Sequence, residues 1–255
     1  MLHVTKGIVF HSFKYSESSV IVKIYTELFG IQSYLFKGIR GPKSRIKPGL
    51  LQPLTLLDLV VYHKEKHSLQ SVKEIHLAHP YQTIPFDIRK SAVALFINEL
   101  VYKTIREEEA NPDLFDFLWS SCLQLDLTDE PVSSFHLIFS LTFSRYLGIF
   151  PQLNHAEKLP IFNLREGLFQ SSVPEHPDYL DPGNSKRLYS LLNACSQPFA
   201  GAQNFEVGAQ NFKPLQSMKA ETRNQLLETI LLYFRLHLPG FSGLQSPRIL
   251  HEVMA

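Results

Sequence analysis

The chain has 255 residues, two cysteines and a formal net charge of +1. This length can bury a full hydrophobic core, in one large domain or in two ordinary ones. With only Cys122 and Cys195, the chain has neither a disulfide framework nor a cysteine-based zinc site. No apolar run reaches the roughly eighteen residues of a membrane span, and no signal peptide follows Met1, so we expect a soluble, cytoplasmic protein.

The net charge conceals two parts of opposite sign. Residues 1–80 contain 11 Lys and Arg against 5 Asp and Glu, a balance of +6. Residues 81–255 contain 14 against 19, a balance of −5. A basic part joined to an acidic one favours an N-terminal nucleic-acid-binding domain, followed by a part of the chain with a different function.

The first eighty residues read as strands. Segments rich in β-branched and aromatic residues, with partial period-two alternation, are separated by short polar turns. Five strands in about eighty residues suit a small closed barrel, and the oligonucleotide-binding (OB) fold is the leading candidate. The predicted strands are residues 4–13, 19–25, 30–38, 54–63 and 68–77.

Aromatic residues of such a barrel serve either the core or base stacking. An OB-fold binds single strands through a basic groove and aromatic platforms, because every base has a π-face. Alternation turns about half of the strand aromatics inward, so we expect only one or two to stack on bases. The pool consists of Phe10, Phe13, Tyr15, Tyr25, Tyr34, Phe36 and Tyr62.

A basic segment lies between the third and fourth predicted strands. Residues 37–47 contain five cations and no acid, and Gly38, Gly41 and Pro42 prevent a helix. We predict a phosphate-binding loop that positions nucleic acid without reading its sequence; the alternative is a solvated loop. Lys6, Lys14 and Lys23 are weaker candidates. The predicted DNA contacts are Lys37, Arg40, Lys43, Arg45 and Lys47.

Beyond Pro80 the apolar residues follow a helical spacing. Residues 150–182, which contain five prolines and a short hairpin-like segment at 160–169, interrupt this pattern. We therefore predict an α+β protein of two domains, an OB-fold barrel at 1–80 and an all-α domain at 81–255 with a small irregular or β insertion. The predicted helices are residues 86–109, 111–125, 131–148, 185–194 and 219–238.

The sequence shows no catalytic constellation. None of the eleven histidines has an HxH or HExxH spacing, and His63, His67, His76 and His79 are interpreted as surface or edge residues of the barrel. Carboxylate pairs with general-acid spacing are absent too, and the acidic run at 107–109 is interpreted as a solvated helix end. We expect no catalytic residue and no enzyme.

An ordered set of motifs resembles a known family. The N-terminal part contains Lys6-Gly7-Ile8-Val9, Tyr15-Ser16-Glu17-Ser18, Lys37-Gly38-Ile39-Arg40, Pro42-Lys43-Ser44-Arg45 and Leu51-Gln52-Pro53-Leu54. The C-terminal part contains Tyr146-Leu147-Gly148-Ile149-Phe150-Pro151, residues 162–167 and residues 233–241. Together these segments, which span nearly the whole chain, resemble the bacterial RecO family of DNA repair proteins.

This resemblance implies an OB-fold barrel, a helical domain and a role as a non-catalytic recombination mediator associated with the nucleoid. Members of that family bind single- and double-stranded DNA and anneal complementary strands. With the partner RecR they help to load the RecA recombinase onto strands coated by single-stranded DNA-binding protein. These partners are accordingly expected for this chain, and no membrane and no cofactor is expected.

The chain departs from the family at one place. Many members carry two CxxC pairs around the irregular insertion, which bind zinc, whereas residues 152–179 contain no cysteine here. His155 and His176 supply two ligands at most, and a structural zinc site needs four. We predict no metal, and expect the insertion to be held by apolar packing of Ile161, Phe162, Leu164, Phe169 and Tyr179.

A second candidate site lies late in a predicted helix. Arg145 and Tyr146 follow an apolar stretch, and a cation beside an apolar groove suits the acidic, Phe-ended tail of single-stranded DNA-binding protein that the resemblance implies. Arg89 and Lys90 are further basic candidates. The alternative is that such an arginine caps its own helix.

Two other functions stay open from the sequence. An RNA-binding or translation-associated OB-fold protein would use the same groove chemistry. A small-molecule enzyme would need a deep pocket with convergent ionisable groups near the proline-rich insertion.

Overall fold

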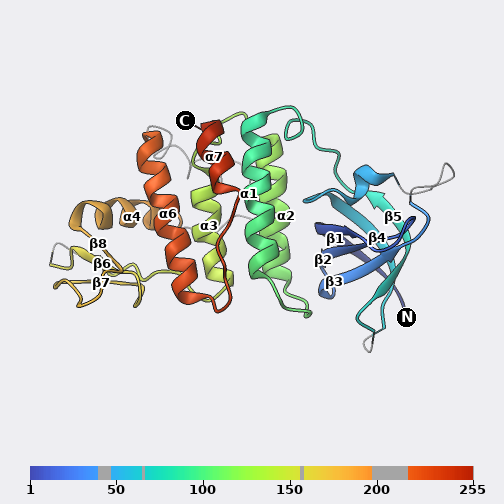
Figure 1. Ribbon diagram of the computed structural model, residues 1–255, viewed down its shortest axis with the longest axis horizontal. Coiled ribbons are helices and arrows are strands. Elements are labelled where there is room, and N and C mark those ends of the chain that lie inside the picture. Colours follow the sequence, from blue (N-terminus) through green and yellow to red (C-terminus); the bar gives the residue numbers. More distant parts are fainter. Residues whose placement is uncertain (40–46, 65–66, 156–157, 197–217, 255) are drawn as a thin grey trace. The chain divides into compact units, whose positions relative to one another are not determined.

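The computed structural model describes residues 1–39, 47–64, 67–155, 158–196 and 218–254 (Figure 1). By internal contacts the chain divides into a barrel unit, Met1–Leu127, and a helical unit, Thr128–Ala255. The barrel unit contains a closed five-stranded barrel and two helices, and the helical unit contains further helices and a three-stranded sheet. The predicted fold class, a barrel followed by helices with a small β insertion, is confirmed.

The barrel strands follow the order β1-β2-β3-β5-β4, and β4 pairs with β1 to close the ring. All neighbours are antiparallel except β3 and β5, which run parallel. A five-stranded closed barrel is the architecture of the OB-fold. The strands are β1 (Leu2–Lys14), β2 (Val20–Thr26), β3 (Gly30–Phe36), β4 (Leu56–Tyr62) and β5 (Gln70–Leu77).

Side chains alternate between the two faces of each strand, and the inward-facing ones fill the interior of the barrel. Inward-facing residues such as Val22, Tyr34 and Leu59 are at most 1% exposed and belong to one apolar cluster. Gly7 of β1 is required here, since a Cβ atom at this position would lie 2.6 Å from Ile24 Cγ2 and 2.8 Å from Leu59 Cδ1. A small barrel leaves no space for a larger residue at that point.

All five predicted helices are present. Three are shorter than predicted, whereas the one expected at 111–125 extends to Leu127 and the one expected at 185–194 begins at Pro182. The predicted helix at 86–109 ends at Thr104, and Ile105 is extended. The backbone of the acidic run contacts the barrel instead, because the Glu107 carbonyl accepts a hydrogen bond from Ile31 N at 3.1 Å. The helices are α1 (Ile88–Thr104), α2 (Pro112–Leu127), α3 (Phe135–Tyr146), α4 (Pro182–Ala194), α6 (Ala220–His237) and α7 (Pro247–Met254), with the 3-10 helix η1 (Pro48–Leu51) before β4.

Within the barrel unit, α2 packs on the outer face of β1 and β2 through a stack of aromatic rings. Phe10 stacks on Tyr25 with a centroid separation of 5.5 Å, and Tyr25 stacks on Phe115 of α2 at 6.1 Å. All three side chains are at most 1% exposed. Burial of three aromatic side chains contributes several kcal/mol and joins this helix to the barrel.

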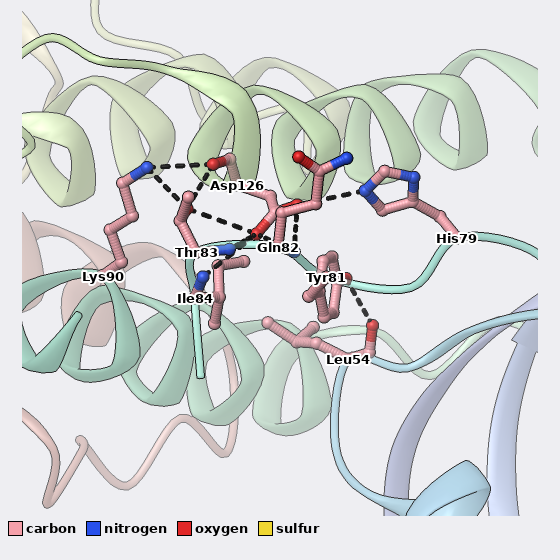
Figure 2. A network of polar contacts seen from close by, with 8 residues as sticks. All are labelled: Leu54, His79, Tyr81, Gln82, Thr83, Ile84, Lys90 and Asp126. Atoms are coloured by element: carbon pink, nitrogen blue, oxygen red, sulfur yellow. Dashed lines mark hydrogen bonds and ion pairs between the residues drawn. The ribbon is translucent and has the colours of Figure 1, made fainter. Parts of the chain in front are cut away.

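The segment that leads from β5 to α1 is fixed by one carboxylate, as Figure 2 shows. Asp126, in the last turn of α2, has a fully buried side chain. It accepts hydrogen bonds from the backbone N–H groups of Gln82, Thr83 and Ile84 at 2.8–3.1 Å. His79 Nε2 lies 3.1 Å from the carboxylate, so this partly exposed residue, which was interpreted as a surface or edge residue, also has a structural contact. The sequence distance of more than forty residues hid this partnership.

Two further side chains complete the network. The ammonium of Lys90 donates to Thr83 Oγ1 at 2.7 Å and to the Asp126 carbonyl at 2.9 Å. The Tyr81 hydroxyl donates to the carbonyl of Leu54 at 2.7 Å. Leu54 has a φ of +61°, a left-handed conformation that is costly for leucine and persists only where the surroundings fix it. The network therefore joins α1, α2 and the start of β4.

The Asp126 carboxyl group is strongly acidic in the folded state. Burial alone would raise its pKa, but the three backbone donors and His79 outweigh burial and lower the pKa to about 2. A folded-state pKa below the unfolded value means that the ionised group stabilises the fold above about pH 4, and that this stabilisation is lost as pH falls toward 2.

The helical unit has a buried histidine at its centre. His136 of α3 is 2% exposed, and burial, with smaller electrostatic contributions from Arg223 and His251, lowers its pKa to about 3. Arg223 of α6 is tied to α7, since its Nη2 donates to the Met254 carbonyl at 2.9 Å. Protonation of His136 would add a cation to a core that already holds a guanidinium.

We expect Asp126→Asn to lower the free energy of unfolding at pH 7 by about 2 kcal/mol or more, because the amide replaces an acceptor with a donor that faces other donors. Urea denaturation measures this. Asp116→Asn, on the exposed face of the same helix, is the control and should change stability by less than about 0.5 kcal/mol. Equal effects of the two substitutions would contradict the role of Asp126.

We also expect the free energy of unfolding to fall as the pH is lowered from about 6.5 to about 3. In this range His136 is protonated in the unfolded state but not in the folded state, so stability falls by up to roughly 1.4 kcal/mol per pH unit. Denaturation series for the wild type and His136→Leu should show a flatter pH dependence in the variant. His76→Gln, in an exposed position of β5, should retain the wild-type slope. Parallel curves for the wild type and His136→Leu would be inconsistent with this role.

Candidate nucleic-acid interface

The predicted DNA contacts lie on both sides of a segment outside the described residues. Arg40, Lys43 and Arg45 fall in that segment, whereas Lys37 and Lys47 are described and exposed. Both flanks are fixed to the barrel: Ile39 is 7% exposed and its N–H donates to the Ser18 carbonyl at 3.0 Å, and Leu51 is 4% exposed. The described residues on both sides of the predicted basic segment are therefore anchored to the barrel.

Strand register places two of the cations at one end of the barrel. Lys14 pairs with Val20 and Val20 pairs with Phe36, so Lys14 ends β1 where Lys37 follows β3. The bond from Ile39 to Ser18 keeps the turn between β1 and β2 beside the beginning of the basic segment. This end of the barrel carries two exposed lysines next to paired strand residues, a suitable arrangement for phosphate groups.

The other lysines that were weaker candidates lie over aromatic rings. Lys6 Nζ is 5.2 Å from the ring centroid of Trp119 in α2, and Lys23 Nζ is 5.8 Å from that of Tyr102 in α1. Both distances fit cation–π contacts, which contribute about 0.5–1 kcal/mol at exposed sites. These contacts hold the helices against β1 and β2, and they leave the ammonium groups positioned at the surface.

The structure sorts the seven barrel aromatics into two groups. Phe10, Tyr25, Tyr34 and Phe36 are at most 2% exposed and belong to the interior. Phe13, Tyr15 and Tyr62 are 40%, 61% and 46% exposed. Only these three members of the pool can meet a base. Phe13 and Tyr15 lie at the same end of the barrel as Lys14 and Lys37.

Two aromatic residues at this surface were missed by the sequence analysis. His11 stacks on Tyr102 of α1 with centroids 4.9 Å apart, and His11 also stacks on Phe13 at 6.1 Å. The period-two series His11, Phe13 and Tyr15 was a visible signal for a shared face. Tyr102 could not be found in this way, because the long-range packing of α1 on β1 brings it there.

The residues predicted to bind a partner's acidic tail have different environments. Lys90 is 6% exposed and belongs to the Asp126 network, whereas Arg89 in the same turn is exposed. The guanidinium of Arg145 lies 3.7 Å from the ring centroid of Phe150, and Nη2 donates to the Cys195 carbonyl at 3.1 Å. Tyr146 is half-buried. Arg145 is thus an exposed cation held against an aromatic ring.

The helical unit also has an open pocket of about 520 Å³ between α4, α6 and the small sheet. Its lining combines apolar residues such as Tyr179 and Leu226 with the cation Arg187 and the acid Glu228. Arg187 is oriented by a hydrogen bond to Asn184 Oδ1 at 3.0 Å. The pocket lies beside the proline-rich insertion.

The described residues of the insertion are held by aromatic contacts and hydrogen bonds. The ring of His155 stacks on Tyr189 at 4.5 Å, and His176 Nδ1 accepts from Asp178 N at 3.2 Å. The side chain of Asn154 makes two hydrogen bonds with the backbone of Phe169: it donates to the carbonyl at 2.9 Å and accepts from the N–H at 2.8 Å. Among the described side chains, no three His, Cys, Asp or Glu residues gather at a metal-binding distance.

The predicted apolar packing of the insertion is found. Ile161, Phe162, Leu164 and Phe169 are at most 6% exposed, and Tyr179 is half-buried. The sheet order is β7-β6-β8, and Ser185 Oγ joins it to α4 by accepting from Phe162 N at 2.9 Å. Apolar side chains and hydrogen bonds thus stabilise this segment, together with the ion pair between Arg165 and Asp178 at 2.7 Å. The strands are β6 (Ile161–Asn163), β7 (Leu168–Gln170) and β8 (Tyr179–Leu180).

None of the helices in the described part of the chain is long and apolar enough to cross a membrane.

Comparisons with known proteins agree with the fold. The family model for the N-terminal part of recombination protein O matches residues 1–81, and the model for its C-terminal part matches residues 85–245. DNA repair protein RecO of Bacteroides fragilis is 37% identical over 254 residues, which cover 99% of each chain. The RecO proteins of Phocaeicola vulgatus and Flavobacterium johnsoniae are each 34% identical, over 100% and 98% of both chains. This chain belongs to the RecO family of DNA repair proteins.

Proposed function

We propose that this protein is a non-enzymatic recombination mediator that binds single- and double-stranded DNA and anneals complementary strands. With RecR, it would help to load RecA onto strands coated by single-stranded DNA-binding protein, in the cytoplasm at the nucleoid. The observation that carries the proposal is a closed five-stranded barrel with a charge of +6 over residues 1–80, in a chain that matches RecO proteins over their full length.

The barrel supports annealing through simple electrostatics. Two DNA strands repel each other through their phosphates, and a protein that neutralises phosphates reduces that repulsion and releases counterions. Lys37 and Lys47 are exposed, and Arg40, Lys43 and Arg45 lie between them in the sequence. Contacts of this kind do not read base sequence, as a mediator that acts on any damaged strand requires.

We place DNA binding in residues 1–80 and protein contacts in residues 81–255. The acidic balance of the second part is unfavourable for phosphate binding but suits contacts with other proteins. An acidic tail that ends in Phe needs a cation next to an apolar surface. Arg145, exposed and stacked on Phe150 next to the half-buried Tyr146, offers both. Arg89 is a separate exposed cation at the start of α1.

RNA binding remains the alternative that shares this chemistry. The family membership favours DNA, because the matching relatives are DNA repair proteins. Competition between DNA and RNA oligonucleotides of one sequence separates the two. An enzyme with its site in the pocket near Arg187 has less support, since the family relatives are repair proteins and a mixed polar and apolar lining also suits a peptide.

We expect Lys37→Ala with Lys47→Ala to weaken binding to oligonucleotides of any sequence and to flatten its salt dependence. Each lost phosphate contact should reduce the slope of log K against log salt by about 0.7 for single strands. Fluorescence anisotropy over a salt series measures both, and adding alanine at Arg40, Lys43 and Arg45 should extend the effect. Lys73→Ala, which removes a lysine paired with Glu74 at 3.3 Å, is the control. An unchanged slope in the multiple variant would remove this segment from the site.

We expect Arg145→Ala to reduce the affinity for a synthetic acidic peptide ending in Phe by roughly tenfold, because a charge-assisted hydrogen bond is lost. Titration of a labelled peptide measures this, with Arg248→Ala, an exposed arginine of α7, as the control. Arg187→Ala is the discriminating variant. A loss confined to Arg187→Ala would move the site to the pocket and overturn the assignment to Arg145.

A further inference from the structure

A β-bulge in β1 reorients the aromatic residues of the barrel surface. Val9 pairs with Ile24, but His11, not Phe10, pairs with the next residue, Lys23. The extra residue, Phe10, is buried against Tyr25. Bulges re-aim side chains next to functional sites. From this point onward His11 and Phe13 lie on the outer face of β1, the face opposite to the core residue Val9.

Aromatic residues follow one another along this face as a track, and three of them are in ring contact. Tyr102 of α1, His11 and Phe13 stack in sequence, with centroid separations of 4.9 and 6.1 Å and interplanar angles of 20° and 27°. Tyr15 follows two residues later and is 61% exposed. From Phe13 to Tyr15 two extended residues advance about 6.6 Å, close to the roughly 6.8 Å that separates two rings with one base between them. Tyr102 and His11, which are 4.9 Å apart, are in direct contact and would offer a base only their outer faces.

Cations run beside this track in the neighbouring strands. The outer-face rows across β1, β2 and β3 are His11–Lys23–Ser33 and Phe13–Ile21–Leu35. Two residues further along β1, Tyr15 lies opposite Ser19, whose carbonyl accepts a hydrogen bond from Tyr15 N at 3.0 Å. Extending the same row to the residue after β3 aligns Tyr15 and Ser19 with Lys37. Lys23 and Lys37 thus flank the two ends of the track, about one and two strand spacings of 4.8 Å away. Glu17, in the adjoining turn, is the nearest acid in sequence.

We propose that Tyr102, His11, Phe13 and Tyr15 form a base-stacking platform for single-stranded DNA, whose phosphates run along Lys23 and Lys37. The inference rests on the proposed DNA binding and deepens it, because it assigns the bases and the backbone to separate rows. The strand lies along β1 and extends beyond the barrel onto α1 through Tyr102. Only unstacked bases can use these rings, so the platform binds single strands and leaves double strands to the lysines alone.

A stacking platform and a phosphate row affect binding differently. Loss of a ring weakens binding by the same factor at every salt concentration, since no counterion is released on stacking. Loss of a lysine changes the salt slope. The two contributions can therefore be separated in one experiment.

The test uses the full-length protein and oligo(dT) that contains a single 2-aminopurine, titrated over a salt series. We expect quenching of 2-aminopurine fluorescence on binding, and affinity about fivefold or more lower for Phe13→Leu and for Tyr102→Leu, with the wild-type salt slope. Phe13→Tyr, which retains the ring, should retain the affinity. Tyr62→Leu is the matched control: it removes an aromatic residue of similar exposure, 46%, paired with Leu2 at the other end of β1.

Wild-type affinity in Phe13→Leu and in Tyr102→Leu, or binding of the wild-type protein without quenching, would overturn the platform and leave the phosphate contacts of the proposed function in place. An equal loss in Tyr62→Leu would also overturn it, since the effect would then be general. A wild-type protein that binds no oligonucleotide at any salt concentration would overturn both the platform and the proposed DNA binding.

Discussion

The buried carboxylate of Asp126 is the interaction on which the barrel unit depends most. A lone ionised carboxylate in a protein interior is very costly, and here three backbone N–H groups and His79 provide the compensation. The same contacts determine the path of residues 79–84, which leave the barrel and enter α1. Because Lys90 bonds to the Asp126 carbonyl as well, the position of α1 follows from the end of α2. The placement of Tyr102 beside His11 depends in turn on the position of α1.

Local patterns in the sequence were sufficient to predict the architecture of the chain. Alternating β-branched and aromatic residues predicted the five strands, and the apolar spacing predicted five of the described helices to within a few residues at most ends. The short helix α7 and the early end of α1 at Thr104 were missed. Helix ends depend on tertiary contacts, and the bond between Ile31 and Glu107 draws the chain away from the helix here. Such long-range contacts leave no periodic signal.

The candidate site could be predicted only in part, for the same reason. The charge split and the basic segment identified the barrel as the nucleic-acid-binding part. The division of aromatics into core and surface required the bulge between Val9 and His11, because one extra residue exchanges the two faces of a strand. The burial of Lys90 and the contribution of Tyr102 arise from helix packing between distant segments, which leaves no local pattern in the sequence. The cysteine-free insertion, by contrast, was correctly expected to rely on apolar packing.

The most direct test of the central claim is the annealing of two complementary oligonucleotides, one of them coated with the cognate single-stranded DNA-binding protein, followed by fluorescence over a salt series. The account predicts that the protein accelerates annealing and that the acceleration declines as salt rises, since neutralisation of phosphates by the barrel lysines drives it. Binding to both strands without any acceleration would contradict the mediator role and would favour the RNA-binding alternative.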